Sequence, residues 1–596
     1  MSSQFEPEGQ APPATGLVLL QACIWGLFCI FALRFWYLQV YKGEHFAAKA
    51  RDNQLRQESS FAPRGLVRDR NGELVAVNEP AYALGLVRED VRDLDATLAQ
   101  VARWTGIPET ELRERFEKGR RRVKPFEHLI LVPDLSFELL AHIEANTLFW
   151  PGLEIVVRPK RRYPQDDLLA HVLGYVAEAN EEELEKDPGL ALGDNMGKGG
   201  LELVLENRLR GVKGLNQVEV DATGRRLNQM VLREPLAGED IRLSIDLNLQ
   251  RRCTEQMAGH AGALVVMDPD TGRILAFVSM PSFDANMFVA GLSTEQWTGL
   301  RDHPRHPLQN RVIQSMFPPG SVFKLVVGAA GLEAGINPRE TVYCNGQVML
   351  GKRVFRCWKK HGHGAVNYQQ AQVQSCDVYF YSLGERLRVD KMAPFATACG
   401  FGQRTGIELP HEKGGLVPTP DWKRRRFGEP WVGGDNYNMA IGQGFNLVTP
   451  LQVTRFLAAL LNGGTLYKPL LLADQEPEAQ GALPMSETTR KLIVDAMVET
   501  VKSGTARRLQ RRDAVMGGKT GTAQVIKLRL KDGDKRETTE EMAYEERDHA
   551  WLASFGEKDG RRYVAVCMVE HGGHGGAVAG PILASVYDYL FGEARR

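Results

Sequence analysis

The longest apolar run of this 596-residue chain lies close to its N-terminus. Residues 16–33 are apolar apart from Gln21, and three aromatic residues at 35–37 continue the run. That length is enough for one membrane-spanning helix with an aromatic belt at its far end. No small-x-small cleavage site follows, which argues against a cleavable signal peptide. We therefore expect a cytoplasmic tail over residues 1–15 and a transmembrane anchor over 16–38.

The polar pattern after the anchor predicts two further regions. Residues 45–235 alternate between short strands and charged helices, and the stretch 108–118 is typical of an exposed helical face. The sequence Leu236-Ala-Gly-Glu-Asp240 marks a boundary. We expect one domain over 45–235 and a second over 236–596. A chain of this length is too long for a single hydrophobic core.

The second domain begins and ends with predicted strands. A first hairpin is expected to pair Gly262–Met267 with Arg273–Ser279, and a second to pair Trp551–Gly556 with Tyr563–Glu570 across a turn at Asp559-Gly560. A short strand over Ile241–Ile245 precedes them, and a helix over Ile582–Phe591 ends the chain. Terminal strands around a central helical block predict an α+β fold, with an antiparallel sheet flanked by helices.

Composition and charge limit the classes of partner that the chain is expected to bind. Apolar residues make up 43% and charged residues 25% of the chain, as in ordinary globular proteins. The formal net charge is zero, which argues against nucleic acid as the main partner. Basic runs at Lys423–Arg426 and Arg507–Arg512 are interpreted as solvated surface.

Three short motifs supply the groups that an acyl-transfer enzyme needs. They are Ser321-Val-Phe-Lys324, Ser375-Cys-Asp377 and Lys519-Thr-Gly-Thr522. The turn at 318–320 and the apolar run 322–332 predict Ser321 at the start of a buried helix, with Lys324 on the same face. Ser321 is the expected nucleophile and Lys324 its base.

The third motif predicts a strand edge along which a substrate backbone can lie. Lys519, Thr520 and Thr522 could hold a carboxylate there, and Gly521 would let the substrate approach. The backbone N–H groups of Ser321 and Thr522 would form an oxyanion hole. Ser375 would relay a proton to the leaving amine.

These motifs resemble those of the penicillin-recognising transpeptidases and serine β-lactamases. The resemblance extends to the class B high-molecular-weight penicillin-binding proteins, and within them to elongation-type members. It rests on Arg64 to Gly72, Arg162-Tyr163-Pro164, His171 to Tyr175 and Gly197 to Glu202 in the first domain, and on Trp358 to Gly364, Gly434-Asp435 and Ile441 to Gly444 in the second. Arg64, Asp69 and Arg70 are expected to tie the base of the first domain together by ion pairs.

The resemblance implies a peptidoglycan D,D-transpeptidase on a pedestal of the dimerisation type. Ser321 would be acylated by a stem peptide and also by β-lactams. The pedestal would bind a membrane glycosyltransferase of the elongation complex. The catalytic domain would lie in the periplasm, anchored in the inner membrane. The charge pattern alone predicts the opposite orientation, with the large domain in the cytoplasm, because Lys and Arg follow the span and none precedes it. We adopt the periplasmic orientation that the resemblance implies.

Asp377 departs from the superfamily pattern, in which an Asn usually ends the second motif. A carboxylate beside Lys324 would favour the charged form of the lysine. That sits awkwardly with Lys324 as a base and leaves the proton route open. Elongation-type members tend to carry Asp at this position.

The cysteines carry a second signal. Cys344, Cys357, His363 and Cys376 have the ligand types of a closed structural zinc site, and Cys376 lies inside the second motif. A Cys344–Cys357 disulfide and three packed thiols are the alternatives. Some elongation-type members are similar in having zinc here. The chemistry itself would need no cofactor.

Two other functions use the same residues. A carboxypeptidase or β-lactamase would hydrolyse the acyl-enzyme, but no clear deacylating Glu motif follows Ser375. A sensor or scaffold would only bind a β-lactam or a partner. The presence of Ser321, Lys324 and Lys519 together favours an active enzyme.

Overall fold

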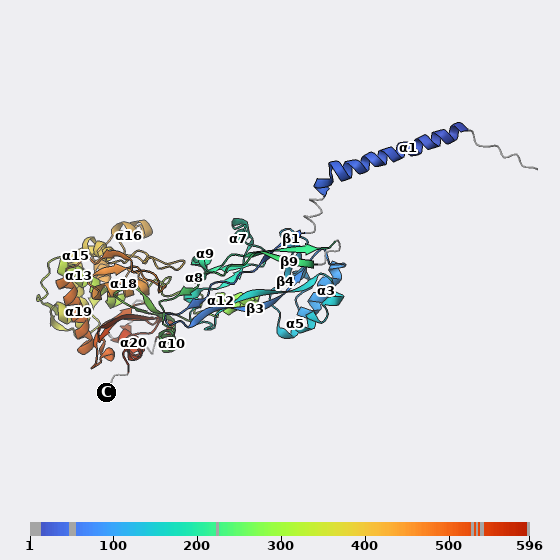
Figure 1. The fold of residues 1–596 in the computed structure, drawn as a ribbon. Coiled ribbons are helices and arrows are strands. Elements are labelled where there is room, and N and C mark those ends of the chain that lie inside the picture. The colour runs from blue at the N-terminus through green and yellow to red at the C-terminus, as the bar shows by residue number, and fades with distance from the viewer. Residues whose placement is uncertain are drawn as a thin grey trace, which may run out of the picture.

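The structure is a computed structural model, and it describes residues 14–46, 55–221, 226–525, 530–531, 535–536 and 542–592. Three parts follow one another along the chain: a separate helix α1 (Ala14–Trp36), a β-rich N-terminal part, and a larger C-terminal part (Figure 1). Of the predicted tail, residues 1–13 lie outside the described residues.

Helix α1 forms where the apolar run predicts it. The helical segment Gly16–Tyr41 is long and apolar enough to cross a membrane, and none of it is buried against the rest of the protein. It includes a short π-helical turn, η1 (Tyr37–Tyr41). The chain therefore carries one N-terminal helix suited to a single-pass anchor.

Two antiparallel arrays run along the N-terminal part. One is a three-stranded sheet in the order β1-β8-β9, formed by Leu55–Ser60, Gly214–Val220 and Arg226–Arg233. The other is built around the long strand β3 (Leu74–Leu86), which pairs with β5 (Leu153–Arg162), β4 (Leu129–Val132) and β2 (Val67–Arg68). A small hairpin joins β6 (Val176–Glu178) to β7 (Asn195–Gly197).

Helices α3 (Leu94–Thr105), α4 (Glu109–Gly119) and α5 (Phe137–Glu144) pack on the end of this array around a small core of their own. Helix α4 confirms the exposed face predicted over 108–118. Its charged residues form i,i+4 ion pairs on the outside, while Leu112 and Phe116 point inward. Four short helices, α6 to α9, complete this part: Ala170–Leu173, Glu181–Lys186, Gly200–Val204 and Glu206–Leu209.

A buried ion-pair network closes the base of the N-terminal part. Arg64 Nη2 lies 2.7 Å from Glu202 Oε2 and 2.9 Å from Glu206 Oε2, and Arg161 Nε lies 2.7 Å from Glu202 Oε1. Burial alone would raise the pKa of Glu202, but the charges of Arg161 and Arg64 outweigh it and lower that pKa. The predicted structural role of Arg64 holds.

Asp69 acts differently from the prediction. Its carboxylate accepts hydrogen bonds from the backbone N–H groups of Asn71, Glu73 and Leu247, at 2.8, 2.8 and 3.1 Å. It therefore fixes a tight turn and ties that turn to helix α10 (Leu247–Gln256). The ion pair expected of it is not formed among the residues that the structure describes.

A five-stranded antiparallel sheet organises the C-terminal part. Its order is β12-β11-β23-β22-β19, formed by Ile274–Met280, Gly262–Met267, Arg561–Val569, His549–Lys558 and Val515–Ala523. Both predicted hairpins are confirmed. Asp559 and Gly560 turn the second one with φ of 51° and 75°.

The strands of this sheet are buried on both faces. In β11, Leu264 and Val266 pack with α10 and α20 (Gly575–Phe591), whereas Val265 and Met267 pack with the central helices. Among these, α13 (Lys324–Glu333) is apolar on all sides except for Lys324 and Glu333, and residues 324–331 are buried. The other helices, α11, α12 and α14 to α19, are Asn286–Ala290, Thr294–Arg301, Tyr368–Val373, Asp377–Ala398, Pro420–Phe427, Gly433–Ala440, Pro450–Leu461 and Glu487–Lys502.

The C-terminal part also contains small two-stranded antiparallel sheets. They pair β13 (Val342–Cys344) with β16 (Gly364–Val366), β14 (Gln347–Leu350) with β15 (Arg353–Arg356), and β17 (Thr465–Tyr467) with β18 (Ala479–Ala482). The short strands β20 and β21 are Leu530–Lys531 and Lys535–Arg536.

Two predicted elements differ in extent. The strand expected over 241–245 is only β10 (Ile241–Arg242), and it pairs in parallel with β2 of the N-terminal part. Helix α20 starts seven residues before the predicted Ile582. Its first residue, Gly575, packs so closely that a Cβ there would lie 2.0 Å from Trp551 O.

Candidate active site

The first motif starts a helix, but through a tighter turn than predicted. Residues Gly320–Phe323 form a 3-10 turn (η3) that leads directly into α13. Gly320 has a φ of +53°, and a Cβ there would lie 2.6 Å from Thr522 O. Only glycine fits this position without strain. The turn therefore holds the half-buried Ser321 against β19.

Lys324 is fully buried and points to the second motif. Its Nζ donates to Asp377 Oδ1 at 2.6 Å, to Ser375 O at 3.0 Å and to Ser375 Oγ at 3.3 Å. The Ser321 hydroxyl forms no hydrogen bond among the described residues. The expected transfer of a proton from Ser321 to Lys324 thus begins from a lysine already engaged by Asp377.

Ser375 lies between two amines. Its Oγ accepts from Lys519 Nζ at 2.9 Å as well as from Lys324. Its φ is +54°, a left-handed conformation that is strained for a residue with a Cβ. Asp377 follows as the first residue of α15. Burial raises the pKa of its carboxyl, and the neighbouring Lys324 opposes that rise.

The third motif lies on the edge strand of the sheet, as predicted. Lys519 is fully buried, and burial lowers its pKa well below the usual range; the charge of Lys324 lowers it further and Asp377 opposes both. Thr520 Oγ1 lies 2.6 Å from Thr505 Oγ1. A Cβ at Gly521 would come 2.9 Å from Pro319 O, so this glycine brings β19 against the nucleophile turn.

Gln443 forms hydrogen bonds at the site that the sequence did not predict. Its Nε2 donates to Thr522 O at 2.9 Å, and its Oε1 accepts from Gln524 N at 3.3 Å. The neighbouring Gly442 O accepts from Gly320 N at 2.9 Å. The Ile441-to-Gly444 motif therefore ties the end of β19 to the nucleophile turn.

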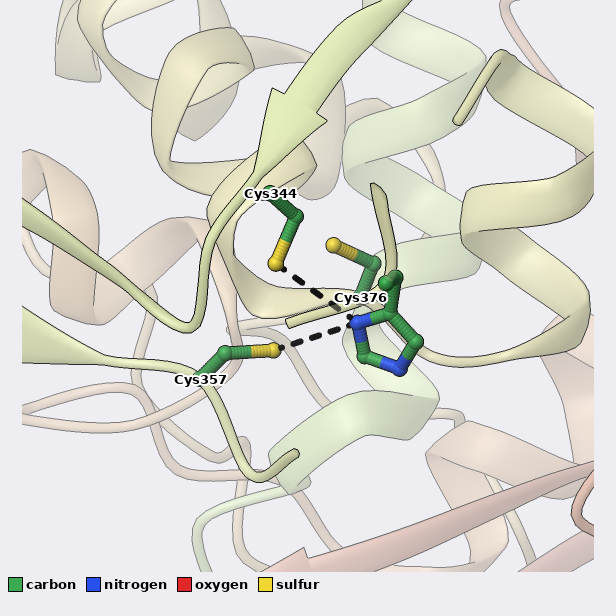
Figure 2. A group of neighbouring side chains, drawn as sticks. Cys344, Cys357 and Cys376 are labelled. Atoms are coloured by element: carbon green, nitrogen blue, oxygen red, sulfur yellow. Dashed lines mark hydrogen bonds between the residues drawn. The ribbon is translucent and has the colours of Figure 1, made fainter. Parts of the chain in front are cut away.

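The four predicted metal ligands come together beside the second motif. Cys344 ends β13, Cys357 follows β15, His363 precedes β16 and Cys376 caps α15. Their ligand atoms all lie within 4.8 Å of one another, and His363 Nδ1 lies 3.6 Å from Cys344 Sγ and 3.5 Å from Cys357 Sγ (Figure 2). No disulfide joins Cys344 to Cys357 in this structure, so the alternative pairing is not formed.

A hydrogen bond between Cys357 and Cys376 shifts the pKa values of these two thiols in opposite directions. A hydrogen bond with Cys376 lowers the pKa of Cys357, against the effect of burial, and His363 adds to the lowering. The same hydrogen bond and burial raise the pKa of Cys376.

Two family models match the chain. One, described as the penicillin binding protein transpeptidase domain, matches residues 262–588, and the other, the penicillin-binding protein dimerisation domain, matches residues 59–243. The chain belongs to the penicillin-binding protein family. The family and the fold class expected from the motifs are thereby confirmed.

Similar proteins define the group within this penicillin-binding protein family. Peptidoglycan D,D-transpeptidase MrdA of Acinetobacter baumannii is 34% identical over 591 residues, which cover 97% of this chain and 86% of the relative. MrdA of Escherichia coli is 31% identical over 575 residues, covering 93% and 90%.

Solved structures of PBP2 proteins are also similar to this chain. PBP2 of Helicobacter pylori in complex with MreC superposes with a TM-score of 0.80 at 29% identity, covering 90% of this chain and 99% of the other. A structure described as a peptidoglycan synthase complex that coordinates polymerization and crosslinking gives 0.70 at 31% identity, covering 97% and 99%. This penicillin-binding protein is a serine-type D,D-transpeptidase of the PBP2 group.

Proposed function

We propose that this penicillin-binding protein cross-links peptidoglycan stem peptides during cell elongation through an acyl-enzyme on Ser321. The observation that carries the residue roles is the position of Ser375 Oγ, within hydrogen-bond distance of the amines of both Lys324 and Lys519. The names of the relatives support peptidoglycan as the substrate.

In the first half-reaction, Ser321 Oγ attacks the carbonyl carbon between the two terminal D-alanines of a donor stem. Lys324, in its neutral form, takes the hydroxyl proton as the ester bond forms. Ser375 passes its hydroxyl proton to the departing amine and takes the proton held by Lys324 in return, so the C–N bond breaks and D-alanine leaves. In the second half-reaction, an amine of a neighbouring stem attacks the ester carbon and forms the cross-link; the C–O bond breaks, and the amine's proton returns to the oxygen of the freed Ser321.

Asp377 would hold Lys324 in place. It binds Lys324 through Oδ1; burial raises the pKa of its carboxyl, and the charge of Lys324 opposes that rise. Lys324 would then act as the base, with Asp377 holding its amine beside Ser375 Oγ.

The edge strand supplies the substrate contacts. Lys519, Thr520 and Thr522 would hold the terminal carboxylate of the donor, and Gly521 leaves room for its backbone. The N–H groups of Ser321 and Thr522 would stabilise the oxyanion, each contributing about 2.7–4 kcal/mol to lowering the barrier. A β-lactam would occupy the same groove and acylate Ser321.

Cys344, Cys357, His363 and Cys376 would hold one zinc ion. A tetrahedral ion with usual Zn–S and Zn–N bond lengths separates sulfur from nitrogen ligands by about 3.6 Å. The two contacts of His363 Nδ1, at 3.5 and 3.6 Å, fit that spacing. Bound there, the ion would serve structure rather than chemistry, by joining the β13–β16 segment to the start of α15.

The N-terminal part would be a pedestal over residues 45–235, followed by the transpeptidase domain over 236–596. Helix α1 would anchor it in the inner membrane with the catalytic domain in the periplasm. Protease added to spheroplasts should then degrade the catalytic domain; full protection would place it in the cytoplasm.

A membrane glycosyltransferase of the elongation complex would bind this pedestal. The synthase complex among the similar structures supports such a partner. So does edge strand β9, whose apolar residues Leu227, Met230, Val231 and Leu232 are exposed. Substituting them with Ser should weaken co-purification with the glycosyltransferase.

The test of the catalytic proposal is acylation. A labelled penicillin should form one covalent adduct, at Ser321, and Ser321→Ala should abolish it. An adduct at another residue would refute the proposed roles.

A further inference from the structure

Trp358 contacts the second catalytic motif through both of its N–H groups. The backbone N–H donates to Asp377 Oδ2 at 2.8 Å. The indole Nε1–H is shared between the carbonyl oxygens of Gln374 and Ser375, at 3.0 and 3.1 Å. Trp358 directly follows Cys357, so it lies between the cysteine cluster and the residues proposed to move protons.

These contacts complement those of Lys324. Each of the two residues binds one carboxylate oxygen of Asp377, and both donate to the carbonyl oxygen of Ser375. Ser375 needs such support because its φ of +54° is strained. Without a donor from Trp358, the serine would relax toward an unstrained conformation and move its Oγ away from the two amines.

Packing alone accounts poorly for a tryptophan at this position. The residue is 50% exposed, and its ring approaches that of His363 edge-on, with ring centroids 5.4 Å apart. A phenyl ring would keep that contact. What only tryptophan supplies here is the N–H aimed at the two carbonyl groups.

We propose that Trp358 is a positioning residue for the acylation step, with its indole N–H holding Ser375 in the conformation that places Oγ between Lys324 and Lys519. This inference rests on the proposed role of Ser375. It predicts a loss in the rate of the chemical step, with little loss in ligand binding, because Trp358 would act on the proton carrier and not on the substrate.

The test compares the full-length protein in detergent with Trp358→Phe and with 3-benzothienylalanine at position 358, in which sulfur replaces the N–H. Fluorescent penicillin gives the dissociation constant of the initial complex and the acylation rate constant separately. Both variants should lose about tenfold in the rate constant, as expected for one lost hydrogen bond. The dissociation constant should stay within about twofold and the Tm within about 2 °C.

Trp297→Phe is the matched control, because Trp297 is a partly exposed tryptophan on α12 with no role in the site, and it should acylate like the wild type. Wild-type rate constants in both position-358 variants would overturn the inference. So would a rate loss that merely follows a loss of folded protein. A wild-type protein that is not acylated at Ser321 would instead refute the proposed function, so the two failures are distinguishable.

Discussion

Lys324 Nζ lies 2.6 Å from Asp377 Oδ1, and both side chains are buried. The pair joins the first catalytic motif to the second through one charge-assisted hydrogen bond. Removing one partner of a buried ion pair leaves the other charge uncompensated, which is far more costly than the pair itself is worth. In this protein the uncompensated charge of Lys324 would lie beside Ser375, which also binds the amine of Lys519.

Asp377→Ala should therefore lower the free energy of unfolding of the catalytic domain by about 3–5 kcal/mol. Asp377→Asn keeps one acceptor oxygen, which can serve Lys324 but not Trp358 as well, and it should lose less than Asp377→Ala. Urea unfolding followed by tryptophan fluorescence measures both. Equal stability of the Ala variant and the wild type would mean that the Lys324–Asp377 pair does not hold the motifs together.

Lys519→Ala should slow acylation by about a hundredfold, since the amine is assigned to the reacting groups. Stability should change little, because an amine buried with a lowered pKa gains little from folding. Stopped-flow labelling and thermal unfolding of the same samples separate the two effects. Lys502→Ala, on the end of α19, is the control, and should change neither. An unchanged acylation rate in Lys519→Ala would place the carboxylate clamp elsewhere.

Purified protein should contain about one zinc ion per chain. His363→Ala should lose the ion, lower the Tm by several degrees and slow acylation, because the free energy of metal binding contributes to ordering the segment around Ser375. Cys399→Ser removes a buried thiol outside the cluster and should keep the ion. Elemental analysis settles the point, and protein that is metal-free when purified without chelators would exclude the site.

Glu202 should make the N-terminal part sensitive to acid. Its folded-state pKa is lowered by Arg161 and Arg64 despite burial, so the unfolded chain takes up a proton more readily. The stabilisation that ionised Glu202 gives to the folded state is complete above the ordinary pKa of a glutamate. It is lost as the pH falls through the lower pKa that Glu202 has in the folded protein. Glu202→Gln should cost about 3–5 kcal/mol at pH 7, and the difference should shrink toward pH 3.

Glu182→Gln provides the comparison for Glu202→Gln. Glu182 pairs with Lys186 on an exposed helix face, so its replacement should leave the unfolding free energy nearly unchanged at any pH. A constant difference between Glu202→Gln and the wild type from pH 7 to pH 3 would contradict the assigned network. Denaturant unfolding at several pH values measures this difference in the free energy of unfolding.

The sequence was informative wherever one local pattern decided the structure. Strands β11 and β12 follow from apolar runs around Asp268 to Gly272, and α1 follows from length and hydropathy alone. The edge position of Lys519 also followed, because the glycines at 517, 518 and 521 mark close backbone approach. The grouping of Cys344, Cys357, His363 and Cys376 was predicted from residue type and confirmed in space.

What the sequence did not predict depends on contacts between distant segments. The left-handed φ of Ser375 is stabilised by Lys324 and Trp358, and no local preference of serine indicates it. The early start of α20 depends on the packing of Gly575 against Trp551. Gln443 donates a hydrogen bond to Thr522, which lies 79 positions further along the chain. The motif that contains Gln443 could be recognised in the sequence, but this hydrogen bond could not.

The central claim is that Ser321 is the acylated nucleophile. Mass spectrometry of full-length protein treated with a labelled penicillin measures this directly, and it also gives the lifetime of the adduct. One label on Ser321 that persists for minutes or longer is the expected result, with none on Ser321→Ala. A label on Ser375, or a labelled Ser321→Ala protein, would contradict the account, and an adduct lost within seconds would favour a β-lactamase-like hydrolase.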